Sequence, residues 1–162
     1  MKFLNVSLLS FFLTSFLASM EIANCNNPNG HAYYHNHGIV DKKSSGWDKD
    51  GFNNVNAVFT LKLLDNKKLD ILFIDATKMI TSVIQSGAKV FPVILTQTSI
   101  SIVVIHSTSV ETYSFWKNTE GENKFSLSQS KTGDIMVRKN SLMVGNCSFI
   151  FFDKLKSLLD NT

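Results

Sequence analysis

Residues 90–116 read VFPVILTQTSISIVVIHSTSVETYSFW, and this stretch indicates the fold class of the chain. β-Branched and aromatic residues dominate it, glycine is absent, and the apolar positions lack the 3.6-residue spacing of a helix. We interpret it as two or three consecutive strands in the middle of a sheet, at least one of them buried on both faces. Pro92 cannot donate a ladder hydrogen bond, so we expect its strand at a sheet edge or a bulge.

Further short strands extend this sheet on both sides. Alternating apolar residues, separated by polar turns, predict strands within 55–63, 69–74, 125–129 and 142–152. Seven or eight short strands at this spacing predict an antiparallel β-sandwich. We also expect one short internal helix beginning at Asp75, for which a strand pair is the alternative, and a short C-terminal helix capped by Asp153.

The first residues are typical of a secretory signal. Residues 1–19 combine Lys2 with a diluted apolar run and small residues at the end. The run is too short and too polar for a stable membrane span. The remainder has the size of one domain, which we divide into an irregular segment over 20–54 and a sandwich over 55–162. The expected location is extracellular.

Charge and hydropathy exclude two classes of partner. Removing Lys2 from the 16 basic residues leaves 15 against 13 acidic ones, too small an excess to favour nucleic acid. No second apolar run is long enough to cross a bilayer. Hydrophobic residues still make up 44% of the chain, which is enough for a substantial core.

The chain has two cysteines, Cys25 and Cys147. In an oxidising compartment we expect them to form a disulfide, the alternative being two free or intermolecular thiols. Neither belongs to a Cys-x-x-Cys pair, so they do not indicate a metal site. Asn146 begins an Asn-Cys-Ser glycosylation sequon, but bridging of Cys147 would compete with the glycan, and both outcomes stay open.

A histidine-rich segment lies at residues 30–38. If it is extended, His31, His35 and His37 point to one face, where three imidazoles could hold Zn²⁺ or Cu²⁺ with an outside ligand. The alternative is a solvated segment whose histidines bind nothing. We expect no other cofactor.

Four short segments carry a resemblance to a known family. Residues 73–77, 90–92, 100–104 and 113–116 read FIDAT, VFP, ISIVV and YSFW. Together they resemble the later half of nematode CUB-like secreted domains, over residues 69–117. The central cysteine of such domains is missing, and the chain continues beyond Trp116. The resemblance implies a β-sandwich with a role in recognition or innate immune defence rather than catalysis.

The ionisable residues do not define a reaction. They are scattered in turns, and only Asp75 and His106 interrupt the apolar strands, with His106 expected as a satisfied strand-end histidine. A rigid sheet could display the 26–50 segment, whose Tyr33, Tyr34 and Trp47 offer contact area. We therefore predict a secreted, non-enzymatic recognition protein for an extracellular protein or glycan. A zinc- or copper-binding protein using the three histidines is the alternative.

Overall fold

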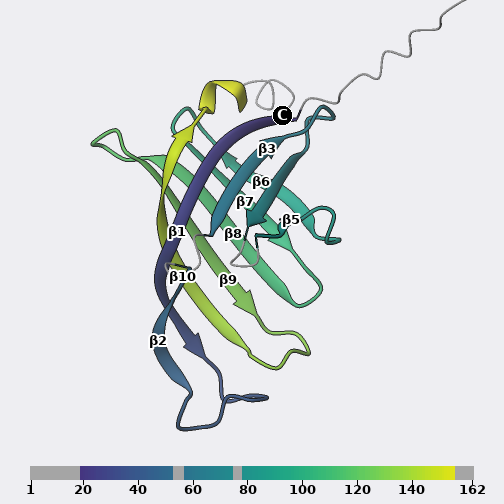
Figure 1. The fold of residues 1–162 in the computed structure, drawn as a ribbon, viewed down its shortest axis with the longest axis vertical. Coiled ribbons are helices and arrows are strands. Elements are labelled where there is room, and N and C mark those ends of the chain that lie inside the picture. The colour runs from purple at the N-terminus through teal and green to yellow at the C-terminus, as the bar shows by residue number, and fades with distance from the viewer. Residues whose placement is uncertain (1–18, 53–56, 75–77, 156–162) are drawn as a thin grey trace, which may run out of the picture.

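The structure is a computed structural model that describes residues 19–52, 57–74 and 78–155. Its strands form one antiparallel sheet that curls on itself (Figure 1). The elements are β1 (Met20–Tyr34), β2 (Gly46–Gly51), β3 (Val58–Leu63), β4 (Leu69–Ile74), β5 (Ile80–Ser82), β6 (Lys89–Leu95), β7 (Ser99–Ile105), β8 (Ser109–Lys117), β9 (Asn123–Lys131), β10 (Lys139–Ile150) and the 3₁₀ helix η1 (Phe152–Leu155). The strand order is β5-β4-β3-β1-β10-β9-β8-β7-β6, and β2 also pairs with β1.

Two predictions fall on residues outside this description. The predicted signal over residues 1–19 lies outside it except for Ser19, and Asp75 lies within the gap at 75–77. Within the described ranges, no helix is long and apolar enough to cross a membrane.

The prediction of a mainly β fold is confirmed, but the sandwich is not. β1 and β10 pair at the centre of the single sheet, and the strands on their two sides fold toward each other. We call β3, β4 and β5 the short wing, and β6 to β9 the long wing. The ring of Phe59 on β3 lies 5.2 Å from that of Phe125 on β9, so the wings share one core. The residues buried between the two wings therefore follow the pattern of a sandwich. The two layers nevertheless belong to one sheet, because β1 and β10 join them by strand hydrogen bonds and by the disulfide described below.

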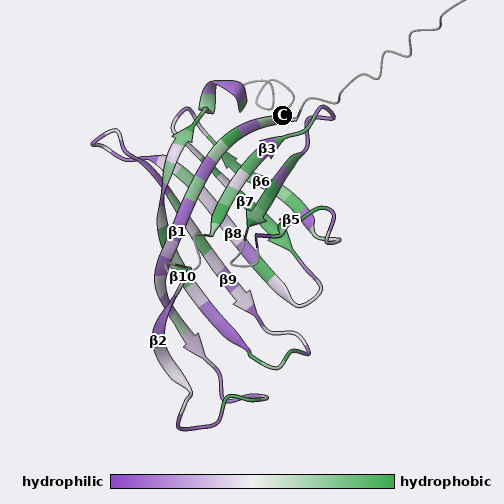
Figure 2. Cartoon of the chain, viewed as in Figure 1, coloured by the Kyte–Doolittle hydropathy of each residue, from purple (hydrophilic) through white to green (hydrophobic). Residues whose placement is uncertain are grey.

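The segment 20–54 was expected to be irregular, and the structure corrects this expectation. β1 and β2 occupy most of it, and β1 lies at the centre of the sheet. The buried positions of β1 include Ile22, Cys25 and Ala32, but Asn, His and Gly between them conceal the alternation. β2 has almost no apolar residue and is coloured hydrophilic in Figure 2, whereas β3 is largely hydrophobic.

β1 changes its pairing partner along its length. It pairs with β3 over residues 20–26 and with β2 over residues 29–34, while β10 runs along its other side. At the change, Asn27 adopts a left-handed φ of 46°, which asparagine tolerates better than most residues. The register with β10 shifts between Asn26 and Asn29, which marks a bulge that bends the sheet. Gly145 is required opposite, since a Cβ there would lie 2.6 Å from the Asn26 carbonyl oxygen.

The 90–116 stretch forms β6, β7 and β8, as its composition predicts, but not in the middle of the sheet. These strands form the outer part of the long wing, and β7 is buried on one face only. Pro92 lies on the edge strand β6, and the register with β7 shifts just after it. Both expectations for Pro92, an edge and a bulge, are therefore met.

The internal helix is replaced by the alternative, a strand pair. Residues 80–82 form β5 against β4, followed by a turn that ends at Gly87. Lys78 has a φ of 61°, so a right-handed helix cannot pass through this residue. The new strand is held to β4 by Ser82, whose Oγ donates a hydrogen bond to the buried Asp70 carboxylate at 2.7 Å. At the C-terminal end the described residues of the predicted helix form only η1, and residues 156–162 lie outside the description.

The predicted disulfide is present. Cys25 and Cys147 are directly opposite each other on β1 and β10, so the bridge lies at the centre of the sheet. Cys25 is fully buried. The bridge therefore reinforces the pairing that connects the two wings.

Loss of this bridge is expected to lower the free energy of unfolding by about 4–5 kcal/mol, because it closes a long loop in the unfolded chain. The two cysteines are 122 positions apart. Urea unfolding of the wild type with and without reductant, beside the Cys25→Ala/Cys147→Ala double variant, measures the effect. The double variant should not respond to reductant. Equal unfolding midpoints for oxidised and reduced wild type would contradict the expected role.

Two phenylalanine substitutions should separate the core from the surface. Phe125 is fully buried between Phe59 and Phe115, so Phe125→Ala should destabilise the fold by about 3–5 kcal/mol. Phe91→Ala removes the same atoms from a side chain that is 45% exposed, and should cost roughly 1 kcal/mol or less. Denaturant unfolding of both variants tests the assignment, which fails if the two losses are equal.

Candidate functional site

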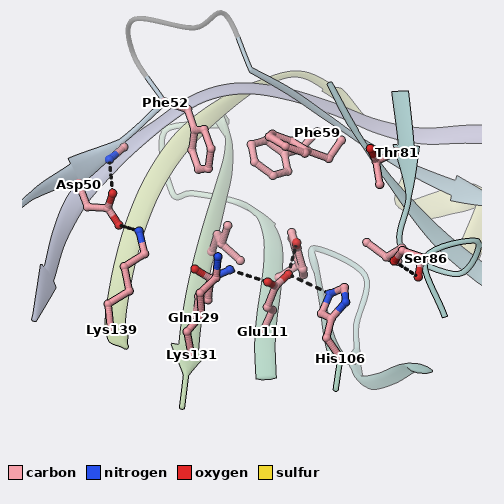
Figure 3. A pocket seen from close by; sticks show the side chains of 15 residues that line it. Asp50, Phe52, Phe59, Thr81, Ser86, His106, Glu111, Gln129, Lys131 and Lys139 are labelled. Carbon is pink, nitrogen blue, oxygen red and sulfur yellow. Dashed lines mark hydrogen bonds and ion pairs between the residues drawn. The ribbon is translucent and has the colours of Figure 1, made fainter. Parts of the chain in front are cut away.

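A cavity of about 410 Å³ lies between the wings, near the ends of β4 and β9 and the beginnings of β3, β8 and β10. Its two sides differ in chemistry. Figure 3 shows the rings of Phe52 and Phe59 on one side, and Lys139, Gln129, Glu111 and His106 along the other. An apolar wall that faces a few polar groups is typical of a small-molecule site.

The apolar wall is built from three phenylalanines. Phe52 packs edge-on against Phe59 and Phe73, with ring centroids 5.6 and 5.5 Å apart. Phe59 and Phe73 lie 4.9 Å from each other. These contacts hold the rings in place, so the wall has a fixed shape.

The polar side follows from the alternation of β8, β9 and β10. Strand register places their inward-facing residues in successive rows across these three strands. The rows are Tyr113–Leu127–Met143, then Glu111–Gln129–Ser141, then Ser109–Lys131–Lys139. The first row is apolar apart from one hydroxyl and belongs to the core. The next two rows are polar, and most of their members border the cavity. The inward-facing side of these strands therefore changes from apolar to polar between one row and the next.

Glu111 is the centre of the polar side and is only 7% exposed. One carboxylate oxygen accepts hydrogen bonds from Gln129 Nε2 at 2.5 Å and Ser109 Oγ at 3.4 Å. The other accepts from the Tyr113 hydroxyl at 2.5 Å and lies 3.6 Å from His106 Nε2. These donors compensate for the water that the buried carboxylate has lost.

Tyr113 responds to this environment. Burial, and then the negative charge of Glu111, raise the pKa of the Tyr113 hydroxyl well above its ordinary value of 10. The hydroxyl therefore remains protonated and continues to donate to Glu111.

A second charged pair lies at the other end of the polar side. Lys139 Nζ is 2.5 Å from Asp50 Oδ2, and both side chains are mostly buried. The Tyr34 ring lies 5.7 Å from the same ammonium. Partial burial, followed by the charge of Asp50, raises the pKa of Tyr34. The pair connects β10 to β2 beside the cavity.

The structure separates the three aromatic residues predicted to contact a ligand. Tyr33 and Trp47 are opposite each other on β1 and β2, with edge-on rings 5.6 Å apart, and Trp47 is 73% exposed. Tyr34 is the next residue of β1, so its side chain points to the opposite, cavity-bearing face beside Lys139. The three residues therefore do not form a common surface.

The three predicted metal ligands are not brought together either. His31 is exposed on β1, the His35 ring nitrogen lies 3.0 Å from the Asn140 side-chain amide, and His37 belongs to a turn that bridges to Val40. In the part of the chain that the structure describes, no group of three His, Cys, Asp or Glu residues could hold a metal ion. The sequon residue Asn146 is exposed, and its amide oxygen accepts a hydrogen bond from Lys124 at 2.9 Å.

Sequence reasoning missed most of the cavity. His106 was singled out as a strand-end histidine, and it lies beside Glu111. The sequence does carry one indication that Glu111 points inward, because Glu111 occupies the same face of its strand as the buried residues Tyr113 and Phe115. Gln129 and Lys131 continue the inward face of β9 in the same way. A charged residue in register with buried aromatics would have indicated a polar site inside the fold.

The raised pKa of Tyr113 predicts a loss of stability at alkaline pH. Above about pH 10 the unfolded chain releases the Tyr113 proton while the folded chain retains it, so the free energy of unfolding falls as the pH rises. Below that pH both states keep the proton, and this contribution is fully present. Denaturant unfolding across this range, with tyrosinate absorbance as the second readout, measures the decline.

Two variants isolate this effect. Tyr113→Phe should make the decline less steep, whereas Tyr33→Phe, a change at a partly exposed site, should leave it unchanged. Ionisation of Tyr113 near pH 10 in the folded protein would contradict the assignment.

Comparison with known proteins gives no relative for this chain. No family model matches it, and no curated protein or solved structure matches it. The function of the cavity is therefore inferred from its own geometry.

Proposed function

We propose that this chain is a secreted, non-enzymatic binding protein that holds a small, largely apolar molecule in the cavity between its wings. The observation that carries the proposal is the fixed wall of Phe52, Phe59 and Phe73 facing a few polar groups across about 410 Å³. An apolar molecule gains free energy by leaving water for such a wall. The polar groups opposite can orient one end of it.

The arrangement of the polar groups favours binding over catalysis. Both oxygens of Glu111 already accept hydrogen bonds from neighbouring side chains, which leaves little acceptor capacity for a substrate. Ser86, a hydroxyl on the cavity wall, donates to the Val83 carbonyl rather than to a base. The two cysteines form the disulfide and supply no thiolate.

Secretion belongs to the same proposal. The disulfide supports an oxidising compartment, and the signal-like residues 1–19 support export. The exposure of Asn146 supports glycosylation at the sequon. A role in recognition or defence, as the resemblance to CUB-like domains implies, is compatible with a protein that binds small molecules outside cells.

A second contact is favoured by the exposed pair Tyr33 and Trp47. Trp47 presents most of its ring to solvent, and Tyr33 supports it edge-on from the neighbouring strand. An exposed, pre-positioned aromatic ring suits contact with an extracellular protein or glycan at low entropic cost. This surface lies on the face of the sheet opposite the cavity, so the two contacts need not exclude each other.

The cavity is tested with 1-aminoanthracene, a neutral aromatic probe whose fluorescence rises in apolar surroundings. The wild type should bind it saturably at one site. Thr81→Trp places a large ring at an exposed position of the cavity wall and should weaken binding roughly tenfold or more by occupying the space. Ser128→Trp, on the other face of β9, is the matched control and should bind as the wild type does. Absence of saturable binding, or equal binding by Thr81→Trp, would refute the proposal.

A further inference from the structure

Two carboxylates and two ammonium groups line the cavity, but they do not all form ion pairs with one another. Asp50 is paired with Lys139, and Glu111 is surrounded by its own donors together with His106. Lys131 also lines the cavity, yet it forms no ion pair with any acidic residue in the described ranges. Among the described residues Lys131 is therefore the lysine of this site that lacks an ion-pair partner.

The register of the sheet explains why Lys131 has no partner of its own. It lies directly opposite Lys139 on β10 and Ser109 on β8. Two like charges opposite each other in a sheet are unfavourable unless something lies between or beside them. Asp50 forms an ion pair with Lys139 but not with Lys131. Lys131 is half-buried and lies on the same side of the sheet as the cavity. An anionic group placed beside Lys131 in the cavity would give this lysine an ion pair.

We infer that the molecule bound in this cavity is a small amphipathic monoanion, with its anionic group paired to Lys131 and its apolar body against the phenylalanine wall. The inference rests on the proposed function and adds the chemical class of the ligand. A cationic ligand would instead have to compete with the donors that already occupy Glu111. A polyanion would require more cations than the one lysine that lacks an ion pair.

The volume limits the size of such a molecule. About 410 Å³ accommodates roughly fourteen water-sized groups at about 30 Å³ each. That is the size of a medium-chain carboxylate or a small aromatic carboxylate. Decanoate fits this limit, and 1-decanol is its neutral counterpart of nearly equal length.

Displacement of 1-aminoanthracene by these two ligands tests the inference. At neutral pH decanoate is ionised, so wild-type protein should release the probe at a decanoate concentration about tenfold lower than the 1-decanol concentration required. Lys131→Met keeps the chain length without the charge, and should bring the two ligands to within about twofold of each other. Lys131→Arg restores the cation and should restore the preference.

Lys124→Met is the matched control, because Lys124 lies on the same strand but faces the other side of the sheet. It should show the wild-type preference. Equal displacement by both ligands in the wild type, or an undiminished preference in Lys131→Met, overturns the inference while probe binding still supports the cavity. If the wild type binds neither the probe nor decanoate, the proposed function itself fails.

Discussion

The change of partner along β1 at Asn27 and Pro28 determines the shape of the molecule. Before this point β1 pairs with β3, and the short wing covers the apolar rows of the long wing. After it β1 pairs with the hydrophilic β2, while β10 and β9 continue alongside. The short wing therefore ends before the long wing does, and the cavity lies where the coverage stops. A bulge in one strand thus accounts for both the bend of the sheet and the position of the cavity.

The chemistry of the long wing follows this geometry. Where Phe59 and its neighbours cover the sheet, the inward residues are apolar, because a polar group there would lose water without replacement. Where coverage ends, Glu111, Gln129 and Lys131 occupy the inward positions. The hydrogen bonds to Glu111 come from side chains on the same strand and the next one, so the network is internal to the long wing. It does not involve residues of the short wing.

The sequence predicts individual strands better than their arrangement. β4 matches the predicted range because Leu69 to Ile74 is bounded by clear turn residues, and Cys25 and Cys147 pair as expected. β1 is not predicted, because its inward residues are often small and its polar residues are numerous. The two-residue alternation of apolar and polar side chains is therefore weak in this strand. Alternation identifies the buried face of each strand but not whether facing layers belong to one sheet or two. The bulge that joins them depends on the backbone of Asn27 and on Gly145, which carry no hydrophobic signal.

The cavity was harder still to predict. Its polar side combines residues from three strands whose relative register the sequence does not state. Glu111 shares a strand face with Tyr113 and Phe115, which indicates an inward position, but the sequence does not show which residues of other strands lie beside it. Only the pairing of Glu111 with Gln129 shows that these residues meet inside the fold.

The central position of β1 and β10 has a consequence for biosynthesis. These strands are among the first and last described parts of the chain, so their pairing has to wait until more than a hundred intervening residues have been made. At ordinary translation speeds this interval is on the order of ten seconds. During it β1 can pair with β2 and β3, but its edge toward β10, and the thiol of Cys25, have no native partner. The nascent chain would therefore depend on chaperones and on oxidases that act late, and Cys25 would be open to mispairing with thiols of other chains until Cys147 emerges.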